Sequence, residues 1–276
     1  MIKKLQAAVI LILLAIVGNG VYNYLKTDRD VVFVGVDGYS APFSITNPSG
    51  ELKGFDIDFI KAVAHAVNLN IDFRLIPFNA LQDSIKKGSV DIVIAPFRID
   101  RIAKTDKTFL SKPYYKNNVV YVVREDDYDD KDSTTKKMTD FSRVCITDKP
   151  KLIKYLRKLE KSPSIMIYSN SGAAFNGLYN NQCDVLVDSK SSASYYITKH
   201  NLRSLKMYDM PENNASVYYK IAINQSKPDL AKQIDAGIDY VIQTRQIDKI
   251  SQKWFSRNSD IKSEQPQDQK NNTLFE

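Results

Sequence analysis

The sequence has few of the side chains that bind transition metals or carry covalent catalysis. Its 276 residues include two cysteines, Cys145 and Cys183, and two histidines, His65 and His200. A structural zinc site gathers about four such ligands at one point, so four residues scattered along the chain give metal chemistry little support. The sequence also has no nucleophile-elbow motif and no glycine-rich loop suited to a phosphate. We therefore expect no metal, no cofactor and no enzymatic activity.

Clustered charge of one sign is also missing. The formal net charge is +7, and charged residues make up 26% of the chain, but basic and acidic residues are interleaved almost everywhere. A nucleic-acid-binding surface requires basic residues gathered on one face. The composition, with 43% hydrophobic residues, is instead typical of a soluble globular protein with a lysine-rich surface. We expect no nucleic-acid partner.

An apolar run near the N-terminus has the layout of a secretory signal peptide. Lys3 and Lys4 precede the run at residues 7–17, and residues 18–20, Gly-Asn-Gly, place small side chains before a cut after Gly20. The run is about half of the roughly 20 residues that span a bilayer comfortably. The alternative is an uncleaved membrane anchor. Both interpretations place the remaining chain outside the cytoplasm, in the periplasm, where the two cysteines could form one disulfide.

Runs that predict strands are interleaved with segments of helical periodicity. The apolar run at residues 31–36 predicts a buried strand, residues 55–67 carry apolar side chains at helical spacing, and residues 71–75 alternate as in a strand. This order is typical of α/β units with parallel strands, and it occurs twice along the chain. The other predicted strands are residues 91–94, 119–123, 144–147, 164–168, 184–187 and 218–223, and the other predicted helices are 81–87, 152–159, 173–179, 191–198, 230–244 and 247–255.

Two α/β units offer one ligand cleft if they face each other. Ligands of open α/β sheets bind at the carboxyl ends of the strands, and a cleft between two units is a common binding site. After residue 257 the chain is polar with almost nothing apolar, which predicts a disordered tail.

Five short motifs carry a resemblance to a known family. They are GFDID at residues 54–58, FNALQDSIKKGSVD at 78–91, SKPYY at 111–115, DVLVD at 184–188 and KWF at 253–255. In this order, behind a signal peptide, they resemble the periplasmic polar-amino-acid-binding proteins of ABC transporters, the bacterial extracellular solute-binding proteins of family 3. The resemblance covers about residues 31–255.

The resemblance implies a two-lobed fold and a transport function. The fold is the type II periplasmic-binding-protein fold, in which two α/β lobes are joined by two crossing strands and close around the ligand. The implied partners of this chain, expected as a monomer, are a small-molecule ligand, most simply an amino acid, and an inner-membrane ABC permease. The implied boundaries are 1–20 for the signal peptide or anchor, 30–119 for lobe one, 120–218 for lobe two, 219–256 for the return to lobe one and 257–276 for the tail.

The family's ligand contacts can be carried over to four positions. A free amino acid buries an ammonium and a carboxylate, which need opposite charges and hydrogen bonds. Asp188 matches the carboxylate that takes the ammonium, although it could instead cap the helix predicted at 191–198. Asp37 matches a second cleft carboxylate, with a turn-forming aspartate as the alternative. Tyr39 and Phe78 match the aromatic walls, with ordinary core packing as the alternative.

The carboxylate-binding side of the family pattern differs in this chain. The family's arginine forks onto the ligand carboxylate; counting forward from Asp91 places it at Ala103, and counting back from Ser111 places it at Lys104, which a one-residue insertion would reconcile. Arg98 stands where a small hydroxyl residue is expected, and it could supply the fork from a different place. The Gly-Thr pair that opens a helix in lobe two is replaced by TDKP at residues 147–150. Asp37, Asp100 and Asp188 near one cleft favour a basic amino acid or a polyamine-like ligand.

Two other functions are compatible with the same sequence. A dehydratase on this fold needs a positioned acid and base, and Asp37 and Asp188 could be assigned to those roles as well as to ammonium binding. A sensor that has lost transport would also explain the departures from the family pattern around Arg98 and residue 148. A search for turnover of a prephenate-like acid, and copurification with a permease, would separate these alternatives.

Overall fold

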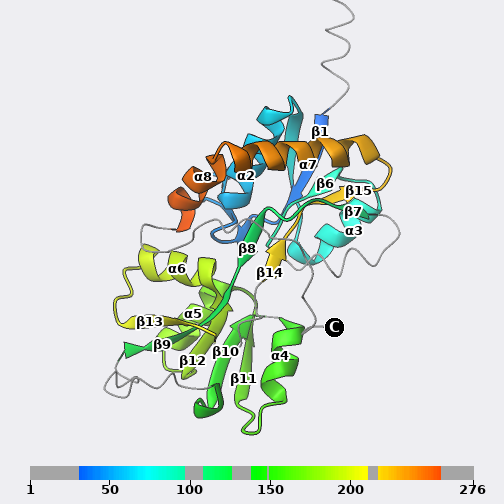
Figure 1. Cartoon of the computed structure of the whole chain (residues 1–276). Helices are drawn as coiled ribbons and strands as arrows, with labels where there is room; N and C mark the ends of the chain where they lie inside the picture. The colour runs from blue at the N-terminus through cyan, green and yellow to red at the C-terminus, as the bar shows by residue number, and fades with distance from the viewer. Residues whose placement is uncertain (1–30, 97–107, 126–137, 148, 211–216, 256–276) are drawn as a thin grey trace, which may run out of the picture.

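The computed structural model describes residues 31–96, 108–125, 138–147, 149–210 and 217–255. Two α/β lobes are stacked along the long axis of the molecule (Figure 1). The predicted signal segment, the tail, Arg98, Asp100 and Lys104 lie outside the described residues.

The first lobe is built on a five-stranded sheet in the order β5-β1-β6-β15-β7. The strand β1 (Val31–Val36) pairs in parallel with β5 (Asn70–Leu75) and β6 (Ile92–Val93). The strand β15 (Ala222–Asn224) pairs antiparallel with β6 and with β7 (Thr108–Leu110). The chain therefore returns near its described end, at β15, to the same sheet that contains its first strand, β1.

Alternation along these strands divides the apolar side chains of the first lobe between two cores. Val34 and Ile92 face the larger core, which is covered by α2 (Phe55–Ala66), α7 (Pro228–Gln243) and α8 (Gln246–Phe255). Val93 faces the smaller core, which is covered by α3 (Leu81–Lys86). Successive side chains of a strand point to opposite faces, so the apolar runs predicted from the sequence supply both cores.

The helix α2 begins where the chain folds back on itself at a glycine. Gly54 has φ 143°, a conformation that side chains rarely adopt, and a Cβ atom there would lie 2.0 Å from the carbonyl oxygen of Phe43. The first N–H groups of the helix, on Phe55 and Asp56, donate to the carbonyl oxygens of Pro42 and Phe43. Donors that a helix leaves unpaired at its start are thus satisfied by the preceding turn.

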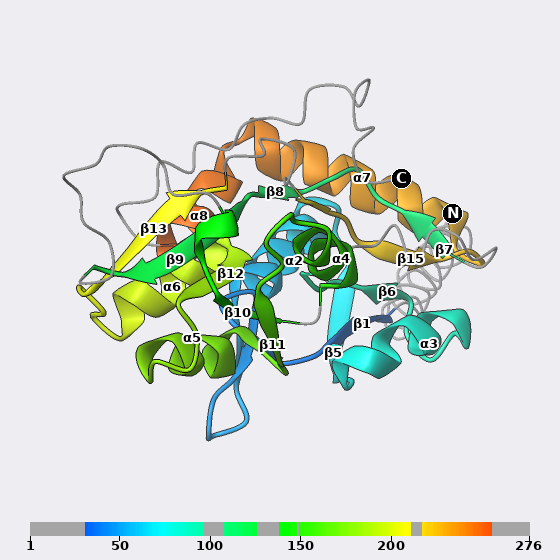
Figure 2. The same ribbon diagram turned by 90° about the horizontal axis from the view of Figure 1, so that it is seen from below.

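The second lobe is built on a five-stranded sheet in the order β11-β10-β12-β9-β13. The strands β10 (Arg143–Thr147), β11 (Ser164–Tyr168) and β12 (Val185–Ser189) run parallel, whereas β9 (Val119–Arg124) and β13 (Leu205–Asp209) are antiparallel to their neighbours. The helix α4 (Pro150–Arg157) covers one face, and α5 (Ser171–Tyr179) and α6 (Lys190–Lys199) cover the other (Figure 2). This lobe has a hydrophobic core on each face of its sheet.

Two short antiparallel strands, β8 (Tyr115–Asn117) and β14 (Val217–Tyr219), carry the chain between the two lobes (Figure 1). The sequence predicted one strand over residues 218–223, and this is wrong in detail, because the segment divides at Lys220. Its first part pairs with β8 between the lobes, and its second part is β15 in the first sheet. An apolar run does not show that its two halves pair with different partners.

The predicted two-lobed α/β fold is confirmed, while three features differ from the prediction. The small sheet β2-β3-β4 (Tyr39–Ser40, Ser44–Thr46 and Leu52–Lys53) and three further strands, β7, β8 and β13, were not predicted. A 3₁₀ turn at Phe78–Ala80 precedes α3, and another lies at Met138–Asp140. Within the described ranges, no helix combines the length and apolar character needed to cross a membrane.

Candidate functional site

Two of the predicted ligand-binding residues lie at carboxyl ends of strands, one in each lobe. Asp37 directly follows β1, an interior strand of the first sheet, and Asp188 is the penultimate residue of β12, the central strand of the second. In open α/β sheets this end of the strands is where ligands bind. The fold therefore gives each lobe a carboxylate in a position suited to ligand contact.

Asp37 is a buried carboxyl with incomplete hydrogen bonding. Its Oδ2 accepts a hydrogen bond from Ser40 Oγ, and its Oδ1 has no hydrogen-bond partner in the part of the chain that the structure describes. Burial raises the pKa of this carboxyl, and the bond from Ser40 opposes the shift. A buried carboxylate that lacks one partner is stabilised by an incoming cation, so Asp37 is suited to hold a positively charged group.

A second buried carboxyl lies in the first lobe. Asp56 belongs to the GFDID motif and accepts a hydrogen bond from the Tyr114 hydroxyl at 2.9 Å. Burial is the main cause that raises its pKa to about 8, the Tyr114 bond opposes the shift, and the Asp37 carboxylate adds to it. Asp56 is therefore largely uncharged near neutral pH, which leaves Asp37 as the carboxylate of the two that a ligand cation would contact.

Asp188 is buried and already paired. Its Oδ1 accepts hydrogen bonds from the Lys149 ammonium at 2.6 Å and from the Ser189 N–H at 2.7 Å. Its Oδ2 is buried and has no hydrogen-bond partner among the described residues. The alternative that Asp188 caps the following helix is wrong, because the cap of α6 is Ser189, whose side chain accepts from the Ser192 N–H. No sequence pattern indicates Lys149 as the partner of this carboxylate.

The two predicted aromatic residues are largely exposed. The exposed fraction is 79% for Tyr39 and 50% for Phe78, so the alternative of ordinary core packing is wrong for both. Tyr39 begins β2, two residues after Asp37, and Phe78 begins the 3₁₀ turn that follows β5. Both positions follow strands of the first sheet at its carboxyl edge, where an aromatic side chain can contact a ligand.

Polar contacts that the sequence analysis missed join the crossing strand β8 to the second lobe. The Tyr115 hydroxyl and Ser191 Oγ form a hydrogen bond, and the Asn117 side chain contacts both Ser191 and the Tyr219 hydroxyl. Burial raises the pKa of Tyr115, which therefore stays protonated and able to donate. Ser191 follows Asp188 by three residues, so this network supports the start of α6 next to that carboxylate. The SKPYY motif contains Tyr115, but a motif alone does not reveal its partner.

The predicted residues Arg98 and Lys104, on the carboxylate-binding side, lie outside the described residues, as does Asp148. No group of three or more histidine, cysteine or acidic side chains suited to a metal ion occurs in the described ranges. What the described residues supply is one buried carboxyl at a strand end of each lobe, Asp37 and Asp188.

Comparison with known proteins supports the two-lobed fold. The family model of bacterial extracellular solute-binding proteins, family 3, matches residues 32–257. The probable amino-acid-binding protein YxeM of Bacillus subtilis is 27% identical over 266 residues, covering 95% of this chain and 98% of that protein. The arginine-binding periplasmic protein of Mannheimia haemolytica is 24% identical, and the alignment covers 77% of this chain and 86% of that protein. Among solved structures, an ancestral cationic amino acid solute-binding protein superposes with a TM-score of 0.69 at 22% identity. The superposition covers 83% of this chain and 96% of the ancestral protein's chain.

Proposed function

Because the chain belongs to the bacterial extracellular solute-binding proteins of family 3, we propose that it binds an amino acid between its lobes and delivers it to an ABC transporter. The observation that carries the proposal is the pair of buried carboxylates, Asp37 and Asp188, at strand ends of separate lobes, each with one oxygen unpartnered among the described residues. A ligand ammonium satisfies such an oxygen, while a ligand without a cationic group leaves it unpaired.

The ligand proposed is a basic amino acid. A basic amino acid carries two cationic groups, one for each lobe. Asp37 supplies the carboxylate of the first lobe, and Asp188 supplies that of the second. Tyr39 and Phe78 would pack on the aliphatic part of the side chain, and Arg98 and Lys104 would contact the ligand carboxylate. Relatives named for arginine binding support this choice.

Two crossing strands allow the lobes to approach each other when the ligand binds. The structure joins the lobes through β8 and β14, and hinge motion in such connections closes a cleft around its ligand. Lobe one is proposed to comprise residues 30–119 and 219–256, and lobe two residues 120–218. The protein is proposed to act in the periplasm after export, where an inner-membrane permease recognises the closed form. Solute-binding activity, rather than catalysis, characterises the family.

Thermal unfolding against a panel of amino acids tests the proposal. A ligand that binds only the folded protein raises the free energy of unfolding by about 2.7 kcal/mol at a hundredfold excess over its Kd. We expect arginine or lysine to give the largest shift, histidine and glutamine smaller ones, and glutamate the smallest. A largest shift with glutamate would contradict the cationic preference, and no shift with any amino acid would contradict amino-acid binding.

A further inference from the structure

Lys149 reaches Asp188 from the neighbouring strand of the second sheet. It lies between β10 and α4, and β10 pairs in parallel with β12, which contains Asp188. Parallel neighbours end at the same edge of a sheet, so the ion pair lies at the edge where ligands of this fold bind. The distance from Lys149 Nζ to Asp188 Oδ1 is 2.6 Å.

The two members of this ion pair differ in their access to water. The Asp188 side chain is 2% exposed, whereas that of Lys149 is 33% exposed. An ordinary surface pair, Lys206 with Glu125, leaves both side chains in contact with solvent, at 32% and 50%. A buried carboxylate without a cation is costly, so Lys149 stabilises Asp188 while no other cation is present. It also places a positive charge on the carboxylate that a ligand ammonium would approach, so the two cations would repel each other if both stayed there.

We propose that Lys149 is a specificity-determining residue of the ligand site. Without ligand, the Lys149 ammonium pairs with Asp188. When the ligand binds, the ligand ammonium replaces the Lys149 ammonium at this carboxylate. The proposal rests on the proposed function, since it assumes a ligand that carries an ammonium. The exchange keeps the buried carboxylate paired, so an ammonium-bearing ligand displaces Lys149 at little cost. A ligand of the same shape that lacks the ammonium is rejected, because displacing Lys149 would leave the buried Asp188 carboxylate unpaired.

Lysine is well suited to this role. Its ammonium is a point charge on a flexible stem, which can leave Asp188 and turn towards water. The Asp188 Oδ2 has no partner in the described part of the chain, so the pair is held through one carboxylate oxygen, which also accepts from Ser189. An arginine could bond both oxygens in a fork, and it would be harder to displace.

Calorimetric titration of the full-length protein and the variant Lys149→Met tests the exchange. The probes are arginine, lysine, histidine and glutamine, together with 5-guanidinopentanoic acid, which is arginine without its α-ammonium. If Lys149 holds Asp188 in about nine molecules of ten, its removal raises the affinity for the tightest-binding amino acid about tenfold. The same variant unfolds at a lower temperature without ligand, because Asp188 loses its partner. The affinity for 5-guanidinopentanoic acid, which lacks the α-ammonium, should not rise in this variant.

A matched control and a second variant make the test decisive. Lys206→Met removes a lysine of similar exposure from an ion pair of the same lobe, and we expect it to leave affinity unchanged. Lys149→Arg keeps the charge pair, so it folds even if Lys149→Met does not, and we expect about tenfold weaker binding. Unchanged or weaker binding by Lys149→Met, or wild-type affinity in Lys149→Arg, would overturn the exchange while leaving amino-acid binding intact. If neither the wild type nor Lys149→Met binds any of the probes, the proposed function is overturned as well.

Discussion

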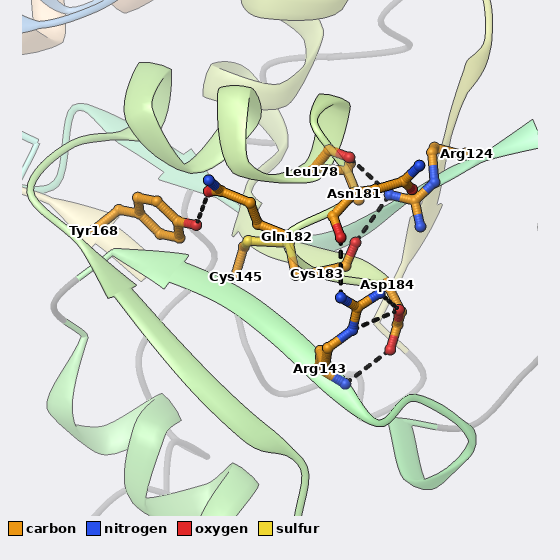
Figure 3. The surroundings of a disulfide bond; sticks show 9 residues. All are labelled: Arg124, Arg143, Cys145, Tyr168, Leu178, Asn181, Gln182, Cys183 and Asp184. Atoms are coloured by element: carbon orange, nitrogen blue, oxygen red, sulfur yellow. Dashed lines mark hydrogen bonds and ion pairs between the residues drawn. A yellow bond between two sulfur atoms is a disulfide. The ribbon is translucent and has the colours of Figure 1, made fainter.

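Breaking the bond between Cys145 and Cys183 is expected to destabilise the second lobe. Both cysteines have no exposed surface, and Cys145 in β10 is joined to Cys183, which lies just before the neighbouring strand β12 (Figure 3). The bond closes a loop with a sequence separation of 38, which contains α4, β11 and α5. In the chain-entropy model, opening a loop of this length lowers the free energy of unfolding by about 4 kcal/mol.

The native loop has other contacts that keep its shape once the bond is opened. The Arg143 guanidinium donates to Asp184, and the Arg124 guanidinium donates to the carbonyl oxygens of Leu178 and Cys183 (Figure 3). These bonds fix the turn that precedes β12 without help from the disulfide. The loss of stability should therefore come mainly from the greater freedom of the unfolded chain.

Urea unfolding with and without reductant measures this loss. The protein is reduced while unfolded and then refolded, and circular dichroism follows both lobes. The single tryptophan, Trp254, lies in α8 of the first lobe, so its fluorescence reports on the lobe without the disulfide. A double variant, Cys145→Ala with Cys183→Ala, should not respond to reductant. A change in the free energy of unfolding below about 1 kcal/mol, or free thiols in the untreated protein, would refute the reasoning.

Two further predictions concern the first lobe. Burial raises the pKa of Asp56 from the ordinary 3.8 to about 8, so its contribution to stability is complete below about pH 4 and is lost as the pH rises through 8. Relative to Asp56→Asn, the wild type should lose about 1.4 kcal/mol per pH unit between about pH 5 and 8 in urea unfolding, and parallel profiles would contradict this. Gly54→Ala places a Cβ against the Phe43 carbonyl and should cost at least about 3 kcal/mol. Gly50→Ala, whose Cβ meets nothing within 4 Å, should cost only about 1 kcal/mol from its positive φ, and equal losses would contradict the steric argument.

Much of the fold could be predicted because the apolar pattern of each strand determines its own burial. The strands at residues 31–36 and 164–168 have the predicted bounds. The strand β8 was missed because three residues carry too little periodicity, and β14 was not separated from β15 because its pairing with β8 joins segments about a hundred residues apart. Local pattern cannot show such distant pairing.

The candidate site was only partly predictable for the same reason. Asp37 and Asp188 could be placed at strand ends from the sequence, because a strand end is a local feature. The Lys149 contact depends on β10 and β12 being parallel neighbours, which brings together residues separated by 39 positions. The disulfide depends on the same pairing. The sequence left it open, and the position of Cys183 beside β10 follows only from the register of the sheet.

The central claim is that carboxylates of both lobes hold a cationic amino acid, and calorimetric titration of arginine tests it most directly. The account predicts binding by the wild type and a loss of about a hundredfold in affinity for both Asp37→Asn and Asp188→Asn, since each removes a charged hydrogen-bond partner worth up to about 3 kcal/mol. Asp209→Asn, which changes an exposed carboxylate of the second lobe, should bind like the wild type. Equal affinity in all four proteins, or no arginine binding by the wild type, would contradict the account.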